Sequence, residues 1–289
     1  MEIINTIVIP HLNNKKGLLR CLETLYKHTP LNFRVILIDQ SDDKELYEEV
    51  KDKVHLHIKA YRNLGFAKAS NYGIRLADTK YVTVLNDDVE FINIRWWDGI
   101  LETFTKYPEA VAVNPSSMRR LNAVGHPEDY PGFPYKEDYT EEEYQEMVDE
   151  CSKVGDEIRE EGIFIDGITP WCVIFERESL LKIGLFDETF FPGGGEDYDF
   201  MNRCYHYGKK HKEADKLVRH RWIGTSHSVA WHWWLSTKKS LDISKNFIDA
   251  SEYYSRKWGN EEHKNPYPMG NQGKKPEEID LPNYVIKEL

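Results

Sequence analysis

The sequence has few cysteines, no excess of basic residues and no long apolar run, and each shortage argues against a class of protein. Only 4 of the 289 residues are cysteine and none forms a C-x-x-C pair, so neither a zinc site nor a dense disulfide framework is expected. The formal net charge of −11 disfavours nucleic acid as a partner. No apolar stretch approaches the roughly 20 residues that span a bilayer, so no transmembrane segment is predicted.

Targeting and cofactor motifs are also missing. The N-terminal stretch MEIINTIVIP has no basic region and continues directly into a strand pattern, unlike a signal peptide. Together with the sparse cysteines, this predicts a cytoplasmic protein. The sequence contains neither G-x-G-x-x-G nor G-x-x-x-x-G-K-[ST], which argues against a Rossmann dehydrogenase and a P-loop kinase, and it has no G-x-S-x-G hydrolase motif.

What the sequence does contain is an alternation of strand and helix patterns over its first 115 residues. Short apolar runs predict strands, and apolar residues at helical spacing predict helices between them. This order predicts an α/β fold with a Rossmann-like, mostly parallel central sheet flanked by helices. The predicted strands cover 6–10, 33–41, 54–61, 81–91 and 110–115, and the predicted helices cover 18–29, 65–78 and 96–108.

Polar residues gather where these strands end. In parallel sheets, ligands bind beyond the carboxyl ends of the strands. We therefore expect four strand ends to face one crevice: Pro10-His11, Asp39-Gln40-Ser41, Asn63 to Gly65, and Asn86-Asp87-Asp88.

The second half of the chain is less regular. Residues 118–162 begin rich in proline and glycine and continue as a strongly acidic segment, where Thr140 and Glu143 have the spacing of a helix capping box. A solvated surface helix is the simplest interpretation. The later patterns predict a strand, helix and turn over 163–190, a helix from 196 that ends at Gly208, a strand and turn over 224–237, a helix over 244–259, and a C-terminal tail.

Two acidic groups are candidates for chemistry. Asn86-Asp87-Asp88 offers hard oxygen ligands that suit Mg²⁺ or Mn²⁺, although such a triplet is also common in turns. Gly193 to Gly195 followed by Glu196-Asp197 allows close approach of a substrate, and one carboxylate could act as general base for a hydroxyl. The alternative for the second group is a flexible loop with an acidic first helical turn.

Two further stretches are weaker candidates. HSVAWHWWLST contains His227, His232 and several tryptophans, which could be packed core residues, a metal ligand, or exposed platforms for sugar rings. Gly65 precedes a helix whose first turn carries Lys68, an arrangement that can bind a diphosphate.

Taken in order, these stretches resemble the inverting glycosyltransferases of family 2, which have the GT-A fold. The resemblance covers about residues 3 to 259. TIVIPHLNN is similar to the family's opening strand and P-x-x-N turn, LIDQSDD to its nucleotide-binding loop, and NLGFAKASNYGI to its N-x-G segment. LNDDVEF stands at the place of the D-x-D metal motif, and GLFDETFFPGGGEDYDFMNRCYHYG is similar to the F-D-E…E-D-x-D block.

The resemblance implies roles for individual residues. Asp39 would bind the nucleobase, Asp87 would lie near the ribose, and Asp88 would be the ligand of Mn²⁺ or Mg²⁺. Asp197 would be the catalytic base, with Glu196 beside it, and His232 best matches a late histidine near the metal, with His227 and His220 as competitors. The other implied donor-site residues are Pro10, His11, Asn13, Asn63, Gly65, Lys68 and Asn86, and the candidates for acceptor stacking are Trp171, Trp231 and Trp233.

The reaction implied is metal-dependent, inverting transfer of a sugar from a UDP-, dTDP- or GDP-sugar to a hydroxyl of a glycan or glycoconjugate. A sugar nucleotidyltransferase and a non-catalytic sugar-binding homologue are the alternatives. The implied division is a nucleotide-sugar-binding half at 1–115, an acceptor-binding and catalytic half at 116–240 with an acidic insertion at 118–162, and a C-terminal helix and tail at 241–289.

The chain departs from the family pattern at three places. Asn86 replaces the first aspartate of a strict D-x-D motif, so that Asp88 is the ligand the resemblance supports best. Gln40 stands where asparagine is usual. Residues 118–162 have no counterpart in the family and could border the acceptor side.

Overall fold

The computed structural model describes most of the chain up to residue 233 and a short C-terminal helical segment. The residues it describes are 3–30, 32–92, 96–117, 140, 142–143, 145–146, 149, 163–164, 170–211, 221–233, 250, 252–254 and 256–258. Among these, no helix combines the length and hydrophobicity needed to cross a membrane.

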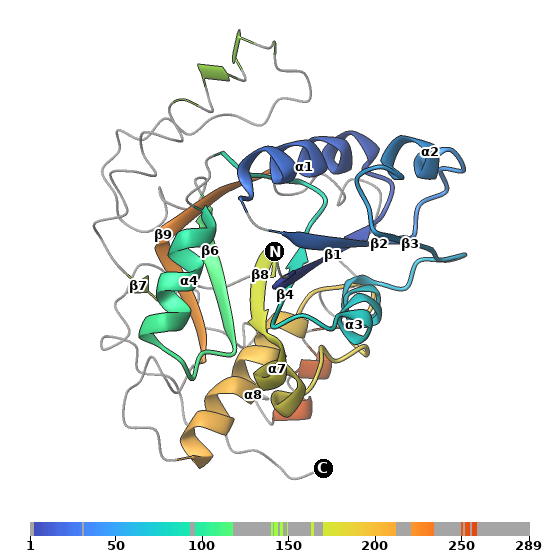
Figure 1. Cartoon of the computed structure of the whole chain (residues 1–289). Coiled ribbons are helices and arrows are strands. Elements are labelled where there is room, and N and C mark those ends of the chain that lie inside the picture. The colour runs from blue at the N-terminus through green and yellow to red at the C-terminus, as the bar shows by residue number, and fades with distance from the viewer. Residues whose placement is uncertain are drawn as a thin grey trace.

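Four parallel strands form the N-terminal half of the sheet, in the order β3-β2-β1-β4. Helices α1 and α2 lie on one face and α3 on the other (Figure 1). Alternate residues of β1 explain both layers, since Ile7 and Ile9 pack in the core cluster that includes α1, whereas Val8 packs in the one that includes α3. The bounds are β1 (Asn5–His11), α1 (Lys15–His28), β2 (Phe33–Asp39), α2 (Leu46–Val50), β3 (Leu56–Lys59), α3 (Phe66–Leu76) and β4 (Tyr81–Leu85).

The rest of the sheet is mixed. Strand β8 pairs antiparallel with β4 and with β6, β9 runs parallel to β6, and the short strands β5 and β7 pair antiparallel with β9. Within the described part of the chain, the sheet has nine strands. The remaining elements are β5 (Val89–Glu90), α4 (Trp96–Lys106), β6 (Ala112–Ser117), β7 (Ile163–Phe164), β8 (Cys172–Glu176), α7 (Arg177–Ile183), α8 (Glu196–Lys210) and β9 (Trp222–His232).

The α/β architecture predicted from the sequence is confirmed, with differences at the level of single elements. The predicted strand 81–91 is two strands, because Asn86 to Asp88 separate β4 from β5. Helix α8 does not end at Gly208 but continues to Lys210, since a glycine costs a helix only about 1 kcal/mol. Helix α2 was not predicted from the sequence.

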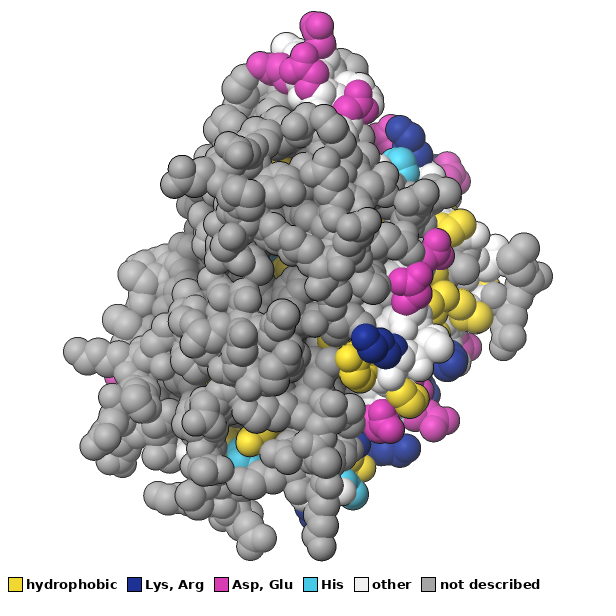
Figure 2. All heavy atoms as spheres, turned by 90° about the vertical axis from the view of Figure 1, so that its left-hand side faces the viewer, with side chains coloured by type: hydrophobic (Ala, Val, Ile, Leu, Met, Phe, Trp, Pro, Cys, Tyr) yellow, Lys and Arg dark blue, Asp and Glu magenta, His cyan; other side chains and the backbone are white. Residues whose placement is uncertain are grey.

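The start of the acidic segment has the predicted capping box. The backbone N–H of Glu143 donates to Thr140 Oγ1 (3.2 Å), and the backbone N–H of Thr140 donates to a carboxylate oxygen of Glu143 (3.0 Å). Glu142, Glu146 and Asp149 are exposed. Acidic side chains gather at the top of Figure 2, the end of the molecule where this segment lies in Figure 1. The described part of the insertion therefore has the acidic, solvated character expected of a surface helix, and the rest of 118–162 lies outside the described residues.

Candidate active site

The carboxyl ends of the parallel strands lie side by side, as the sequence predicts. His11 is in register with Asp39, and Asp39 is in register with Lys59. The chain leaving β2 stays beside β1, because the backbone N–H of Gln40 donates to the carbonyl of His11 (2.9 Å). The strand ends that carry polar residues therefore form one continuous edge.

Asp39 is completely buried at this edge and accepts four hydrogen bonds. Ser41 donates its backbone N–H (2.8 Å) and its hydroxyl (2.6 Å) to Oδ1, while His57 Nε2 (3.0 Å) and Lys59 Nζ (2.9 Å) contact Oδ2. Burial alone would raise the pKa of Asp39, but the hydrogen bonds from Ser41, Lys59 and His57 hold it below its ordinary value. Asp39 is therefore an ionised acceptor beside a cation.

His57 and Lys59 were not singled out from the sequence. Both belong to β3 and are two residues apart, so their side chains leave the same face of the strand. The alternation in VHLHIKAY was the available signal, but it does not say that this face meets Asp39.

Asp87 is bound to the end of β1. One carboxylate oxygen lies 2.6 Å from Nδ1 of the fully buried His11, and the other accepts a hydrogen bond from Asn14 Nδ2 (3.2 Å). Burial raises the pKa of Asp87 above its ordinary value, in opposition to His11, which lowers it. Two of the predicted donor-site residues, His11 and Asp87, are thus in direct contact.

Asp88 lies beside His232. Oδ1 of Asp88 is 3.2 Å from Nε2 of His232, and the two side chains are at most 10% exposed. Pairing of β5 with β9 causes this proximity, because Val89 is in register with His232 and the backbone N–H of Trp233 donates to the carbonyl of Asp88 (3.0 Å). Trp171 stacks on the imidazole at 5.2 Å with an interplanar angle of 11°, which fixes its orientation.

Of the three histidines considered from the sequence, His232 is the one that the described structure places beside Asp88. His220 lies outside the described residues, and the side chain of His227 is also outside them. Asn86 lies beside the same Asp88–His232 pair, since its Nδ2 is 3.5 Å from His232 Nε2.

The possible metal ligands of the Asp88–His232 pair fit Mn²⁺ or Mg²⁺ in one specific way. Among the described residues, no group of three or more His, Cys, Asp or Glu side chains could hold a metal ion. Asp88 and His232 provide one oxygen and one nitrogen, and ions of this class are commonly held by one or two side chains together with substrate phosphates and water. The residues present therefore suit an ion whose coordination a diphosphate completes.

The loop that contains Gly193 to Gly195, called the glycine loop below, lies against the start of α3 through the neighbouring Pro192. The backbone N–H of Phe66 donates to the carbonyl of Pro192 (2.8 Å), and a Cβ on Gly65, which has φ +77°, would be 2.9 Å from that oxygen. Asn63 accepts a hydrogen bond from the Gly65 N–H (2.8 Å). Two N–H groups at this helix start, those of Gly65 and Phe66, thus donate within the protein, and Lys68 Nζ lies 3.9 Å from Glu188 Oε2. The predicted diphosphate contact by Gly65 and Lys68 stays a prediction.

Glu196 and Asp197 follow the glycine loop at the start of α8, and both are at most 6% exposed. The backbone N–H of Gly194 donates to Glu196 Oε2 (2.6 Å), and that of Tyr198 donates to Asp197 Oδ1 (2.9 Å). Burial, reinforced by the neighbouring carboxylate of Asp197, raises the pKa of Glu196 to about 8. Glu196 is therefore protonated at neutral pH.

The raised pKa of Glu196 predicts a pH-dependent stability. Between its ordinary pKa of 4.5 and about 8, the unfolded chain loses a proton that the folded chain keeps, so the free energy of unfolding falls as pH rises through this window. Glu196→Gln cannot ionise, and its amide oxygen can still accept from Gly194. We expect its Tm to match the wild type near pH 4.5 and to exceed it by ~2 °C or more at pH 8.

Thermal unfolding at both pH values measures this difference. Glu48→Gln is the matched control and should show no such pH trend, because it changes an exposed glutamate on α2, distant in sequence from Glu196. A Tm difference for Glu196→Gln that is the same at both pH values contradicts a raised pKa.

The three tryptophans considered for acceptor stacking have little exposed surface. Trp171 and Trp231 are 4% exposed and Trp233 is 8% exposed, and Trp233 Nε1 donates to Glu90 (2.6 Å). All three side chains are buried, which favours packed core residues among the alternatives left open by the sequence, and acceptor stacking by these tryptophans stays a prediction. Trp171 contacts His232, and the neighbouring Trp234 lies outside the described residues.

Comparisons with solved structures place the fold. The mannosyltransferase PcManGT from Pyrobaculum calidifontis, in complex with GDP-Man and Mn²⁺, superposes with a TM-score of 0.56 at 14% identity over 89% of this chain and 65% of that one. GalNAc-T7 with UDP, GalNAc and Mn²⁺ superposes with a TM-score of 0.55 at 15% identity over 90% of this chain and 49% of that one. The likeness confirms the GT-A fold expected from the motifs.

Comparisons with related sequences identify the family as well as the fold. The chain is 30% identical to glycosyltransferase GlyG of Streptococcus pneumoniae over 94 residues, which are 30% of this chain and 31% of that protein. It is 27% identical to an uncharacterized glycosyltransferase of Haemophilus influenzae over 201 residues, 68% of this chain and 60% of that protein, so it spans less than two thirds of either relative. The family model described as Glycosyl transferase family 2 matches residues 6–152, just over half of the chain. The chain belongs to glycosyl transferase family 2.

Proposed function

We propose that this chain transfers a sugar, with inversion, from a nucleoside diphosphate sugar to a hydroxyl of a glycan or glycoconjugate, and that it depends on a divalent metal ion. The contact that carries the proposal is the one between Asp88 and His232 at 3.2 Å, next to the carboxyl ends of the parallel strands. Family membership supports the reaction class, and two structural neighbours hold a nucleotide or nucleotide sugar together with Mn²⁺.

The donor lies, in this proposal, along the strand ends of residues 1–115. Asp39 accepts from the nucleobase, which requires Lys59 or His57 to yield one of the hydrogen bonds that now saturate the carboxylate. Asp87, already oriented by His11, lies near the ribose. The base is that of UDP, dTDP or GDP, and neighbours in complex with GDP-Man or UDP support this class of donor.

Asp88 and His232 would hold the metal ion. When bound, Mn²⁺ or Mg²⁺ supplies positive charge where the diphosphate leaving group gains negative charge. This need is acute here, because the chain has a net charge of −11 and two adjacent aspartates would otherwise repel the donor.

Asp197 is the proposed base. It takes the proton of the acceptor hydroxyl while the hydroxyl oxygen bonds to the anomeric carbon, and the bond from that carbon to the diphosphate oxygen breaks. The nucleoside diphosphate leaves with the bonding electrons, and attack from the opposite face inverts the configuration. Glu196, protonated at neutral pH, adds no second negative charge beside Asp197 and can donate a hydrogen bond to the acceptor.

The acceptor and the base lie, in this division of the chain, in residues 116–240, and the glycine loop is one of the segments of this half that contact the donor half, beside the strand pairs β4–β8 and β5–β9. The contact of the loop is the hydrogen bond between Phe66 and Pro192 (2.8 Å). Residues 241–289 complete the proposal as a C-terminal helix and tail.

A donor-hydrolysis screen tests the proposal. Wild-type protein is incubated with a panel of UDP-, dTDP- and GDP-sugars, each with Mn²⁺, with Mg²⁺ or with EDTA, and released nucleoside diphosphate is measured. We expect metal-dependent release from one nucleotide class. No release and no metal-dependent binding from any donor would contradict a glycosyltransferase, and synthesis of a nucleotide sugar from a sugar phosphate and a nucleoside triphosphate would identify a nucleotidyltransferase instead.

A further inference from the structure

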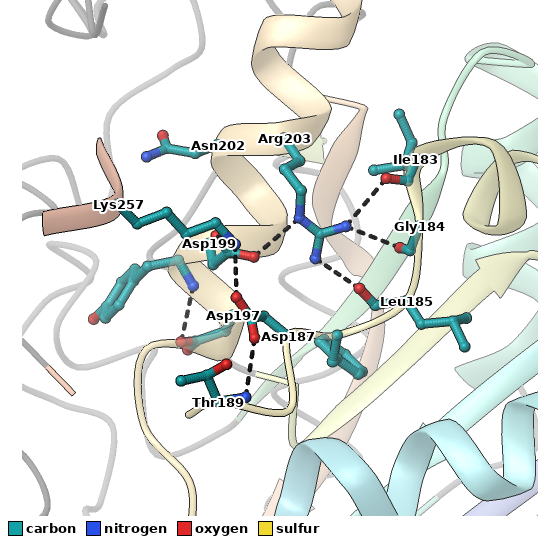
Figure 3. A network of polar contacts seen from close by, with 12 residues as sticks. Ile183, Gly184, Leu185, Asp187, Thr189, Asp197, Asp199, Asn202, Arg203 and Lys257 are labelled. Atoms are coloured by element: carbon teal, nitrogen blue, oxygen red, sulfur yellow. Dashed lines mark hydrogen bonds and ion pairs between the residues drawn. The ribbon is translucent and has the colours of Figure 1, made fainter. Parts of the chain in front are cut away.

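A polar network joins the C-terminal helical segment to α8 just after the Glu196-Asp197 pair (Figure 3). Asp199, which is completely buried, accepts from Arg203 Nε (2.9 Å), Lys257 Nζ (2.7 Å) and Trp258 Nε1 (3.1 Å). Two of these donors, Lys257 and Trp258, come from residues 250–258. The C-terminal segment therefore contributes directly to the environment of α8's first turn.

Lys257 also contacts a second carboxylate, on the other side of the glycine loop. Its Nζ lies 2.7 Å from Asp187 Oδ2, which also accepts from the Tyr253 hydroxyl (2.8 Å). Burial would raise the pKa of Asp187, but hydrogen bonds led by Lys257 hold it well below its usual range. Burial likewise opposes the charge of Lys257, yet the nearby carboxylates of Asp199 and Asp187 raise its pKa, so the ion pair of Lys257 with Asp187 is charged at neutral pH.

The stretch between Asp187 and Asp199 contains Gly193 to Gly195 and the Glu196-Asp197 pair. Gly194 and Gly195 have φ of 105° and 99°, a region that other residues rarely adopt. A run of three glycines loses much conformational entropy when it is ordered, so its own sequence does not fix its path. Contacts outside the loop must do so.

The ammonium group of Lys257 contacts both ends of this stretch, Asp187 and Asp199. Arg203 strengthens the first end, because its guanidinium donates to the carbonyls of Ile183, Gly184 and Leu185 at 2.8 to 3.1 Å. Apolar contacts also hold the loop in place, since Phe190 packs with Ala250, Tyr254 and Trp258 of the C-terminal segment. Gly195 lies close to the same ring, because a Cβ on it would be 2.7 Å from Phe190.

We propose that Lys257 is a positioning residue, which orders the glycine loop through Asp187 and Asp199 and thereby fixes Glu196 and Asp197 in the geometry that catalysis requires. The inference rests on the proposed function for the role of Asp197, although the ordering of the loop is independent of it. In this proposal Lys257 acts through the loop and not on the reactants or the metal ion, so Lys257 belongs to the catalytic machinery although it lies outside residues 116–240.

Lys257→Met tests this proposal by separating turnover from donor binding. We expect kcat to fall at least tenfold, because a displacement of about 1 Å in a catalytic group can cost 10²-fold, whereas the Kd for UDP or GDP with Mn²⁺ should change less than twofold. Lys257→Arg, which keeps the charge, should recover part of kcat. Lys51→Met, which breaks an exposed ion pair with Glu48, is the matched control and should leave kcat unchanged. A lowered Tm with unchanged kcat would reduce Lys257 to a purely structural role.

Hydrogen exchange at the amides of Gly193 to Gly195 gives a readout that does not require activity. We expect faster exchange in Lys257→Met than in the wild type and in Lys51→Met. Should Lys257→Met fail to fold, Asp187→Asn keeps the shape of the side chain and removes one charge partner, and the same increase is expected. Unchanged exchange in the folded variants overturns the proposal, whereas wild-type protein that releases no nucleoside diphosphate from any donor overturns the proposed function alone.

Discussion

Replacing Asp197 by asparagine is expected to abolish sugar transfer while leaving donor binding nearly intact. The amide cannot accept the proton of the acceptor hydroxyl, and general-base catalysis contributes roughly 10² to 10⁴ in rate. Asparagine keeps the shape of the side chain, and its amide oxygen can still accept the hydrogen bond from the Tyr198 N–H that aspartate accepts at 2.9 Å. The measurement is kcat for transfer beside the Kd for the nucleoside diphosphate with Mn²⁺.

Two comparison variants make the result specific. Asp78→Asn changes an aspartate whose side chain is 71% exposed and pairs with Arg34, so it should keep wild-type kcat. Glu196→Gln keeps the neutral form that Glu196 has at pH 7, and we expect a smaller loss than for Asp197→Asn. The assignment of the base is wrong if Asp197→Asn retains more than about a tenth of the wild-type kcat, or if Glu196→Gln is the more damaged variant.

Much of the N-terminal fold could be predicted because the physical rules involved are local. Apolar strands alternate with helices, and the carboxyl ends of parallel strands meet at one edge whatever their sequence. The direction of β8 was not predictable in the same way, since a strand buried on both faces has the same apolar pattern in either orientation. The antiparallel pairing of β8 with β4 joins residues 172–176 to residues 81–85, a contact between distant parts of the chain that no local pattern encodes.

The candidate site shows a similar division between local and distant information. The sequence pointed to Asp88 and to His232 separately, but their contact follows from the pairing of β5 with β9, two strands separated by more than 130 residues. Lys257 gave no signal of its own, because a lysine in a helical segment is ordinary, and Asp187 stood out only as the aspartate of the F-D-E motif, without a role. The sequence could not decide whether the tryptophans are exposed or buried, since an aromatic cluster has the same sequence pattern whether its rings face solvent or the core.

Replacing Asp88 by asparagine is expected to remove the metal dependence of donor binding and to reduce turnover at least 100-fold. The reason is that the metal ion, which would neutralise the diphosphate, then loses its carboxylate ligand. The order of affinities for UDP or GDP is the specific prediction. Wild type with Mn²⁺ should bind most tightly. Wild type in EDTA should bind no better than the variant, because there the carboxylate of Asp88 repels the diphosphate, whereas asparagine does not. Titration calorimetry with Mn²⁺ and with EDTA measures all four affinities.

The neighbouring aspartate supplies the matched control. Asp87 is held by His11 (2.6 Å) and Asn14 (3.2 Å), whereas Asp88 faces His232. Asp87→Asn should therefore weaken binding by a similar factor with and without Mn²⁺, while Asp88→Asn should weaken binding only with Mn²⁺. His232→Gln should follow Asp88→Asn in direction, and the double variant should lose less than the sum of the two, since both side chains would hold the same ion. If Mn²⁺ improves binding to Asp88→Asn as much as to the wild type, the ion is held elsewhere and the site proposed at the end of β4 is wrong.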